Sequence, residues 1–381
     1  MSFEGLEVGY DIPAKPGMAV SDIATPALVI DLDALEANLR KMGAMAAGMG
    51  VALRPHGKMH KSADVARLQH DIGGASGICC QKVSEAEAFI RAGITDVLVT
   101  NQVRGAKVDR LARLPLLGAK VGVCVDDLAS VAELAEAAAR HGTELRVLVE
   151  IECGGGRCGV VDPADVVTIA KAVIDAPGLT FDGIQAYHGS LQHVQTYADR
   201  LKGFEAQIAT VQAAIKALTE AGIACPTVTG AGSGSFEFEG RSGIYTELQC
   251  GSYAFMDVDY GRIEAEGGGR LDGDWRNALF VAATIISKTR PGLAVGDAGL
   301  KAMTTESGLP TVFGRSDVHA AGVSDEHSNL SDPTDSLKIG DRLRLIPGHC
   351  DPTCNLHDWY VAIRGDTVEA LWPVTARGKS F

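Results

Sequence analysis

The sequence has few aromatic residues, no surplus of basic charge and no long apolar run. Aromatic residues make up 5% of the 381 positions, whereas hydrophobic residues together reach 46%. The core must therefore consist mostly of Ala, Val, Leu and Ile. A net charge of −13 argues against nucleic acid or an anionic membrane as the main partner. No run is long enough to span a bilayer, and Met1-Ser2-Phe3-Glu4-Gly5 lacks the pattern of a secretory leader. We therefore expect a soluble, cytoplasmic protein.

The nine cysteines do not form a disulfide or zinc pattern. Their number is odd, and several stand inside apolar, strand-like runs. Cys350 and Cys354 have no second pair at zinc-site spacing. Buried, reduced thiols are therefore expected.

Strand-like and helix-like segments alternate along the first two thirds of the chain. The β-rich runs lie at 51–55, 77–81, 96–100, 120–125, 145–151, 180–187, 226–229 and 246–254. Ala-rich and Leu-rich stretches of helical spacing separate them, and 235–245 is the weakest because it is short and polar. Eight such strands predict a TIM (β/α)8 barrel. A doubly wound open sheet is the alternative, but no Rossmann glycine fingerprint follows the first strand.

Segments of a different kind flank the barrel. Pro26–Leu32 has the composition of a strand, and Asp33 can cap a helix over 34–45. Beyond about residue 265, short alternating runs indicate an antiparallel β domain. These runs are 278–287, 293–295, 342–346, 359–363 and 368–372. We predict an N-terminal segment joining the β domain (1–32), the barrel (33–265) and a C-terminal β domain (266–381).

Reactive and glycine-rich residues gather where the predicted strands end. Active residues of a barrel lie at this C-terminal face. Lys58 ends the run Arg54-Pro55-His56-Gly57-Lys58, and a lysine there is either part of a basic loop or a Schiff-base amine. The later strands end in Gln81, in the turn of Arg157, in Tyr187-His188-Gly189 with His193 close behind, and in Gln249-Cys250-Gly251-Ser252.

The glycine-rich run after the seventh strand is the candidate phosphate site. In 229–235, Gly232 and Ser233 would let backbone N–H groups approach an anion, although most such loops are flexible turns. Together with Gly251 and Ser252 and a strand-end lysine, the run suggests pyridoxal phosphate held by Lys58. Arg157 is then a candidate donor to the cofactor's phenolic oxygen, with a surface salt bridge as the alternative. Gln249 is a candidate partner of the pyridine nitrogen.

A second cluster lies in the predicted β domain. His349 and Asp351 are two residues apart in a turn broken by Gly and Pro. An imidazole and a carboxylate suit Mn²⁺, Co²⁺, Fe²⁺ or Mg²⁺, with water or substrate completing the shell. Asp325-Glu326-His327 is a similar cluster of carboxylate and imidazole side chains. It is either an acidic loop or part of the site.

Together these motifs resemble a known family. Arg54–Lys58, Gly156-Arg157-Cys158-Gly159-Val160, Tyr187-His188-Gly189, Tyr245–Gln249 and His349-Cys350-Asp351 are similar to the motifs of the D-threonine aldolase group. These are fold-type III pyridoxal phosphate enzymes built like alanine racemase. Within the group, the segments Glu7–Pro13, His56–Ser62 and Trp372-Pro373-Val374 are most similar to members that act on 3-hydroxy-D-aspartate.

The resemblance implies roles for individual residues. Lys58 would be the Schiff-base lysine, and His193 would be the base near the substrate hydroxyl. His349 and Asp351 would bind the divalent metal. The family varies at position 188, so His188 receives no role. The cofactor contacts would be Gln81, Arg157, Tyr187, Gly232, Ser233, Gln249, Gly251, Ser252 and Tyr260.

The implied activity is a metal-assisted retro-aldol cleavage of a small 3-hydroxy-D-amino acid. The favoured reaction takes 3-hydroxy-D-aspartate to glycine and glyoxylate. A D-threonine aldolase, a dehydratase acting on D-serine or 3-hydroxy-D-aspartate, and a non-catalytic pyridoxal phosphate carrier are the alternatives. Carriers of this fold typically lack a second domain. An arginine, a lysine or His60 would bind the distal carboxylate of the substrate. A homodimer is expected.

Overall fold

The structure is a computed structural model that describes residues 3 and 5–381. Met1, Ser2 and Glu4, part of the start considered above, lie outside the described residues. The chain forms two compact units. The barrel unit comprises Arg40–Lys58, Val65–Gly251 and Gly378–Phe381, and the β unit comprises Met1–Leu39, Met59–Asp64 and Ser252–Arg377. The domain bounds predicted above rest on the change in composition and strand pattern along the sequence, and they stay a prediction.

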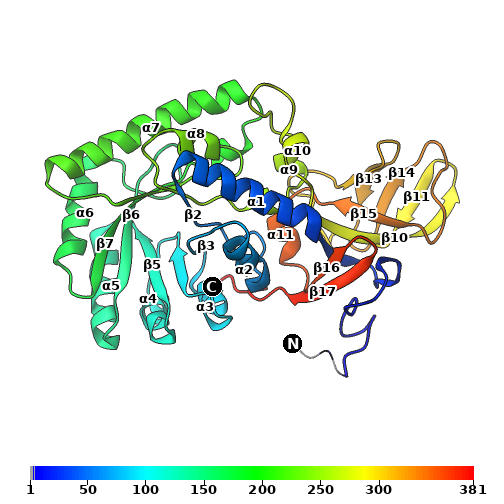
Figure 1. Ribbon diagram of the computed structural model, residues 1–381, viewed down its shortest axis with the longest axis horizontal. Coiled ribbons are helices and arrows are strands. Elements are labelled where there is room, and N and C mark those ends of the chain that lie inside the picture. The colour runs from blue at the N-terminus through cyan, green and yellow to red at the C-terminus, as the bar shows by residue number, and fades with distance from the viewer. Residues whose placement is uncertain (1–2, 4) are drawn as a thin grey trace. The chain divides into compact units, whose positions relative to one another are not determined.

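Eight parallel strands form the centre of the barrel unit, in the order β2-β9-β8-β7-β6-β5-β4-β3 (Figure 1). Their bounds are β2 Ala52–Leu53, β3 Ile78–Cys80, β4 Asp96–Val99, β5 Lys120–Val125, β6 Leu145–Glu150, β7 Leu179–Ala186, β8 Thr227–Gly230 and β9 Glu247–Leu248. A parallel bridge between His56 and Cys79 joins the two outer strands, and Gly57 N–H donates to Cys79 O at 2.7 Å. The sheet therefore closes on itself, so the TIM-type barrel is confirmed and the open sheet is wrong.

Helices follow the strands as the apolar periodicity predicts. Polar side chains cap the N-termini of several of these helices. The Asp127 side chain accepts from Ser130 N–H, and the Thr196 side chain accepts from Asp199 N–H. The helices are α2 Ala63–Asp71, α3 Val83–Arg91, α4 Ala106–Arg113, α5 Leu128–His141, α6 Pro163–Asp175, α7 Tyr197–Glu220 and α8 Phe236–Arg241. Short 3-10 turns η2 Leu114–Leu117 and η3 Ser190–His193 interrupt the connections.

Charged side chains fill one layer of the barrel interior. Arg54 donates to Glu247 at 2.9 Å and to Asp96 at 2.6 Å, and Arg146 also donates to Asp96, at 2.5 Å. An apolar cluster fills another layer: Cys79, Leu98, Cys124 and Leu148. Strands β2, β4, β6 and β9 are thus cross-linked inside the barrel, which fixes the positions at which their ends present side chains.

The last barrel strand is shorter than the predicted run 246–254. After Leu248 the chain leaves the sheet, and Ser252–Ala254 forms the 3-10 turn η4. Ser252 O accepts from the N–H groups of Phe255 and Met256, so local turn bonds replace strand pairing there. Gly251 and Ser252 consequently belong to the loop beyond the strand.

The β unit contains nine strands in the order β11-β14-β13-β12-β15-β10-β1-β16-β17. They are β1 Ala27–Asp31, β10 Leu279–Arg290, β11 Leu293–Gly296, β12 Thr311–Val312, β13 His319–Val323, β14 Ser328–Ser331, β15 Arg342–Ile346, β16 Trp359–Arg364 and β17 Thr367–Pro373. An added pairing of β11 with β10 closes six of them into a second barrel. β1 pairs with β10 and β16, so the N-terminal strand joins this unit.

The short helices of the β unit are η1 Val20–Asp22, α9 Val258–Gly261, α10 Leu271–Asp274 and α11 Cys350–Cys354. The long helix α1 (Leu32–Met49) begins earlier than predicted. The Asp31 carboxylate caps the first turn of α1, because it accepts a hydrogen bond from Ala34 N–H at 3.1 Å. The predicted cap Asp33 already lies within the helix and pairs with Arg364, so that prediction is wrong.

All nine cysteines are free thiols, and seven of them are buried, whereas Cys158 and Cys225 are partly exposed. Within the described part of the chain, no helix combines the length and apolar character needed to cross a membrane.

Candidate active site

Lys58 follows the first barrel strand and is half-buried. Its N–H donates to His56 Nδ1 at 3.3 Å, and His56 Nε2 lies 3.1 Å from the Thr100 hydroxyl beyond β4. Gly57 between them has no room for a side chain, because a Cβ would lie 2.5 Å from Ile78 Cδ1. The segment is therefore held tightly against β3 and β4, which fixes the start of the Lys58 side chain.

Gln81 follows β3 and forms hydrogen bonds with α3 and with the segment after β4. Its N–H donates to Glu85 at 2.6 Å, and its amide donates to Thr100 O at 3.4 Å. Its carbonyl accepts from Asn101 Nδ2 at 3.2 Å. Its side chain thus lies at the same end of the barrel as Lys58.

Glu152 organises the glycine-rich turn after β6. Burial raises the pKa of Glu152, but hydrogen bonds from the N–H groups of residues 154–157 outweigh it, and the net pKa is lowered. Arg157, at the end of this turn, is more than half exposed. Its guanidinium lies 5.7 Å from the centre of the Tyr187 ring. The structure therefore brings two predicted cofactor contacts together.

Glu150, the last residue of β6, is a buried carboxyl that sequence reasoning missed. It is 3% exposed, accepts from Gln102 Nε2 at 2.6 Å and lies 3.9 Å from Arg157. Burial raises its pKa, against the opposing effects of Gln102 and Arg157. Nothing in the run Leu-Arg-Val-Leu-Val-Glu distinguishes it from an ordinary strand end.

The glycines at the end of β8 and in the loop after it are required by close packing. A Cβ on Gly230 would lie 2.1 Å from Ala186 O, and one on Gly232 would lie 2.5 Å from Gln192 Oε1. Gly234 N–H donates to the same Gln192 oxygen at 3.0 Å. Ser233 between them is buried. The predicted phosphate loop is thus a tight, ordered turn, and part of its backbone already bonds within the protein.

The Gln249 amide is bonded inside the barrel. It exchanges two hydrogen bonds with Gln185, at 3.0 and 2.6 Å, and donates to Thr229 Oγ1 at 2.9 Å. Contact with a pyridine nitrogen would have to replace one of these bonds. Its cofactor role stays a prediction.

The two histidines after β7 occupy different surroundings. His188 packs over the β6 turn, where a Cβ on Gly154 would lie 2.3 Å from its Nε2, and burial lowers its pKa. His193 ends η3 and is exposed. An exposed imidazole at this end of the barrel remains accessible to a substrate proton.

His349 and Asp351 lie together in the β unit, at the start of α11. His349 Nε2 is 3.5 Å from Asp351 Oδ1, and its Nδ1 is 2.5 Å from Glu306 Oε1. Burial lowers the pKa of His349, but Asp351, Asp257 and Glu306 outweigh it and raise the pKa to about 9. Glu306 was not predicted, because it is distant in sequence and stands in an ordinary Thr-Glu-Ser turn.

Asp257 ties this turn to the segment that carries Tyr260. Its two carboxylate oxygens accept from Tyr260 N–H at 2.9 Å and Cys350 N–H at 2.8 Å. Burial raises the pKa of Asp257, against the opposing effects of Tyr260, His349 and Cys350. The predicted metal ligands and Tyr260, a predicted cofactor contact, therefore share one buried anchor.

The donor set of this turn fits a divalent cation. Metal-bound imidazoles usually donate their second nitrogen to a carboxylate, as His349 Nδ1 is placed to do toward Glu306. Among residues 3 and 5–381, no group of three or more His, Cys, Asp or Glu has metal-binding geometry. Of the described residues, His349 and Asp351 are the two that a cation here would take as ligands.

The barrel residues likewise fit pyridoxal phosphate. A lysine amine suits its aldehyde, and the small residues at 230–235 suit its phosphate. His60 fits no ligand role, because it is fully buried against Phe255.

Asp325-Glu326-His327 forms the turn between β13 and β14, where Ser324 N–H donates to His327 O and Glu326 pairs with Lys301.

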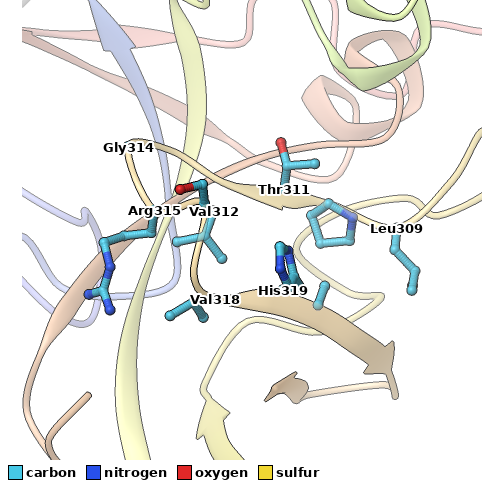
Figure 2. A pocket seen from close by; sticks show the side chains of 10 residues that line it. Leu309, Thr311, Val312, Gly314, Arg315, Val318 and His319 are labelled. Carbon is cyan, nitrogen blue, oxygen red and sulfur yellow. The ribbon is translucent and has the colours of Figure 1, made fainter. Parts of the chain in front are cut away.

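A separate pocket of about 590 Å³, shown in Figure 2, is lined by residues between 309 and 320 of the β unit. Its Arg315 pairs with Asp317, lowering the pKa of Asp317 to about 2. No predicted site residue lines this pocket.

Known proteins resemble the chain along its full length. The family model for the alanine racemase N-terminal domain matches residues 30–259, and a serine dehydratase domain model matches residues 278–363. A 3-hydroxy-D-aspartate aldolase of Paracoccus denitrificans (strain Pd 1222) is 59% identical over 100% of this chain and 98% of its own.

Two solved structures extend the comparison. A D-threonine aldolase of Filomicrobium marinum has a TM-score of 0.93 and 45% identity, covering 97% of this chain and 100% of its own. A cysteine-to-alanine variant of D-threo-3-hydroxyaspartate dehydratase, in its metal-free form, has a TM-score of 0.81 and 29% identity, covering 93% and 98%. The chain belongs to the alanine racemase-like family of aldolases that includes 3-hydroxy-D-aspartate aldolase and D-threonine aldolase.

Proposed function

We propose that this chain is an aldolase that cleaves 3-hydroxy-D-aspartate into glycine and glyoxylate, with pyridoxal phosphate and a divalent metal as cofactors. The full-length 59% identity to a 3-hydroxy-D-aspartate aldolase carries the proposal. The arrangement of Lys58 at the barrel mouth and of His349 beside Asp351 supports it. When bound, pyridoxal phosphate would accept the electron pair left at Cα, and the metal would act as a Lewis acid at the β-hydroxyl.

Most of the proposed contacts to the cofactor belong to the barrel unit, whereas Ser252 and Tyr260 belong to the β unit. Lys58 supplies the amine that binds the cofactor aldehyde. Gly232 and Ser233 would bind its phosphate, with Gly251 and Ser252 following β9. Arg157, held near Tyr187, would donate to the phenolic oxygen. The remaining contacts proposed are Gln81, Gln249 and Tyr260.

The β unit would select which bond breaks. His349 and Asp351 would hold the metal, with Glu306 orienting the imidazole. His193 would accept the β-hydroxyl proton. The Cα–Cβ bond then breaks, the Cβ–oxygen bond becomes the aldehyde of glyoxylate, and a proton added at Cα completes glycine. A racemase of the same fold removes a Cα proton and needs no metal.

Product analysis tests the proposal. Incubating the protein with 3-hydroxy-D-aspartate, pyridoxal phosphate and Mn²⁺ should give glycine and glyoxylate in equal amounts. Ammonia and a keto acid would instead identify a dehydratase, and glycine with acetaldehyde from D-threonine alone would identify a D-threonine aldolase. The expected homodimer and cytoplasmic location are further proposals, and light scattering would measure the former.

A further inference from the structure

One buried glutamine joins the two loops to which phosphate binding and proton transfer were assigned. Gln192 is 0% exposed. Its Oε1 accepts from Gly234 N–H at 3.0 Å. Its Nε2 donates to Ser235 Oγ at 2.7 Å and to His188 O at 3.3 Å. A single amide therefore binds the loop after β8 and the loop after β7, directly before His193.

The atoms around the Gln192 amide are closely packed. A Cβ on Gly232 would lie 2.5 Å from Gln192 Oε1, and a Cβ on Gly234 would lie 2.7 Å from Gln192 O. Real Cβ atoms do not approach so closely, so hydrogen is the only substituent that fits at either position. The two loops thus contact each other through backbone and amide atoms at van der Waals distance.

A buried network holds the amide in its orientation. Ser235 Oγ, which accepts from Gln192, donates to Glu239 Oε1 at 3.0 Å. Gln207 Nε2 donates to Glu239 at 3.2 Å and to Tyr245 OH at 2.6 Å. The Tyr245 hydroxyl donates to Ala186 O at the end of β7 at 2.9 Å. The chain of bonds that begins at the β7 loop therefore returns to β7.

Glu239 is suited to this position as a neutral acid. It is 0% exposed, and burial raises its pKa to about 7. The titratable groups that face it are Tyr245, Cys153 and Cys250, and burial raises the pKa of each. Among the described residues, no donor reaches Glu239 Oε2 or Gln207 Oε1. A proton on Glu239 would supply one.

We propose that Gln192 is a positioning residue: with Ser235 and Glu239, it locks the Gly232–Ser235 loop to the loop that carries His193. The cofactor's phosphate and the proton acceptor are thereby held in a fixed mutual position. The inference rests on the proposed function, which assigns the phosphate and the proton transfer to these loops.

The test compares pyridoxal phosphate with pyridoxal, which lacks the phosphate, in Gln192→Leu. Binding is read from the absorbance of the ligand bound to Lys58, without turnover. We expect the affinity for pyridoxal phosphate to fall about tenfold, because two hydrogen bonds that fix the loop are lost. The affinity for pyridoxal, which does not use the loop, should change less than about twofold.

Two further variants complete the experiment. Gln69→Leu removes another buried glutamine, on α2, and should leave the ratio of the two affinities unchanged. Ser235→Ala removes the middle of the network with a smaller change, and should give the same selective loss if Gln192→Leu does not fold. Equal losses for both ligands, or unchanged affinities, would overturn the inference. A wild-type protein that binds neither ligand would instead contradict the proposed function.

Discussion

At the scale of single residues, the position of the Lys58 amine depends on the rigidity of the segment before it. His56 bonds to Thr100, and Gly57 fits against Ile78 with no space for a side chain. A lysine held at a barrel mouth in this way can bind an aldehyde repeatedly at one place.

Replacing Lys58 tests its role directly. Lys58→Ala should abolish the absorbance band of lysine-bound pyridoxal phosphate and reduce cleavage at least about 10³-fold, because the covalent anchor is lost. Lys82→Ala, directly before α3, is the control and should keep the band. An unchanged spectrum in Lys58→Ala would rule out the cofactor assignment.

Glu306 should tune the proposed metal site through His349. Glu306→Gln weakens the bond to Nδ1, so the affinity for Mn²⁺ should fall about 10- to 100-fold. His349→Ala should behave like protein treated with a chelator. Glu326→Gln, which alters a carboxylate paired with Lys301 on the β13–β14 turn, is the control. Metal titration followed by activity and by magnetic resonance measures all three variants. Equal Mn²⁺ affinity in Glu306→Gln and wild type would contradict the role.

Glu239 should make stability depend on pH. Its pKa is raised to about 7, whereas an unfolded glutamate titrates near ~4.3. The folded protein therefore holds the extra proton between these values, and the stabilisation, complete below about pH 4, is lost as the pH rises to about 7. From about pH 5 to pH 8 this loss is about 2 to 3 kcal/mol.

Urea unfolding of the cofactor-free protein measures this effect. Glu239→Gln cannot ionise, so its free energy of unfolding should lack that decline. Glu136→Gln, on the exposed face of α5, should reproduce the wild-type profile. Parallel profiles of Glu239→Gln and wild type would show that Glu239 does not titrate in this range.

At the scale of elements, the ion-pair layer inside the barrel sets the positions of the strands. Arg54, directly after β2, bridges Glu247 on β9 and Asp96 on β4. Because β2 and β9 are two residues long, few backbone bonds hold them in the sheet. The side-chain layer compensates for this.

Removing the bridging guanidinium should be costly. Arg54→Met leaves Glu247 without its cation and leaves Asp96 with Arg146 alone, so the free energy of unfolding should fall by about 3 to 5 kcal/mol. Arg113→Met, which removes an exposed pair with Asp109, should cost less than about 0.5 kcal/mol. Denaturant unfolding measures both. Similar values for the two variants would show that the buried layer adds no stability.

The elements also show what the sequence could predict. The barrel strands were predictable, because buried parallel strands are continuous apolar runs between helices of clear periodicity. Strands β12, β13 and β14 were not, because segments such as His-Ala-Ala-Gly-Val are short and show no alternation. The strand at 246–254 was predicted too long, since turn bonds at Ser252 end it without any break in hydrophobicity.

Site residues could be predicted from the sequence where a reactive side chain lies next to a strand end. Lys58, Arg157 and Tyr187 were predicted in this way, and the structure places Arg157 beside Tyr187. Glu306 and Gln192 were not predicted, because each contacts a partner that only the fold brings near. Sequence spacing carries no information on such contacts.

At the scale of the whole molecule, the residues proposed for the cofactor aldehyde and phosphate and those proposed for the metal belong to different parts of the chain. The barrel unit carries the lysine and the loops for a phosphate, and the β unit carries the His349–Asp351 pair. Related proteins with this architecture include an aldolase and a dehydratase, so the fold alone does not determine which bond breaks or which side chain of the substrate is accepted.

The central claim is therefore tested most directly by comparing kcat/KM for 3-hydroxy-D-aspartate and D-threonine, with glycine as the measured product. We predict a higher kcat/KM for 3-hydroxy-D-aspartate, with an equal amount of glyoxylate formed. A higher value for D-threonine, or turnover of 3-hydroxy-D-aspartate without glycine, would contradict the account.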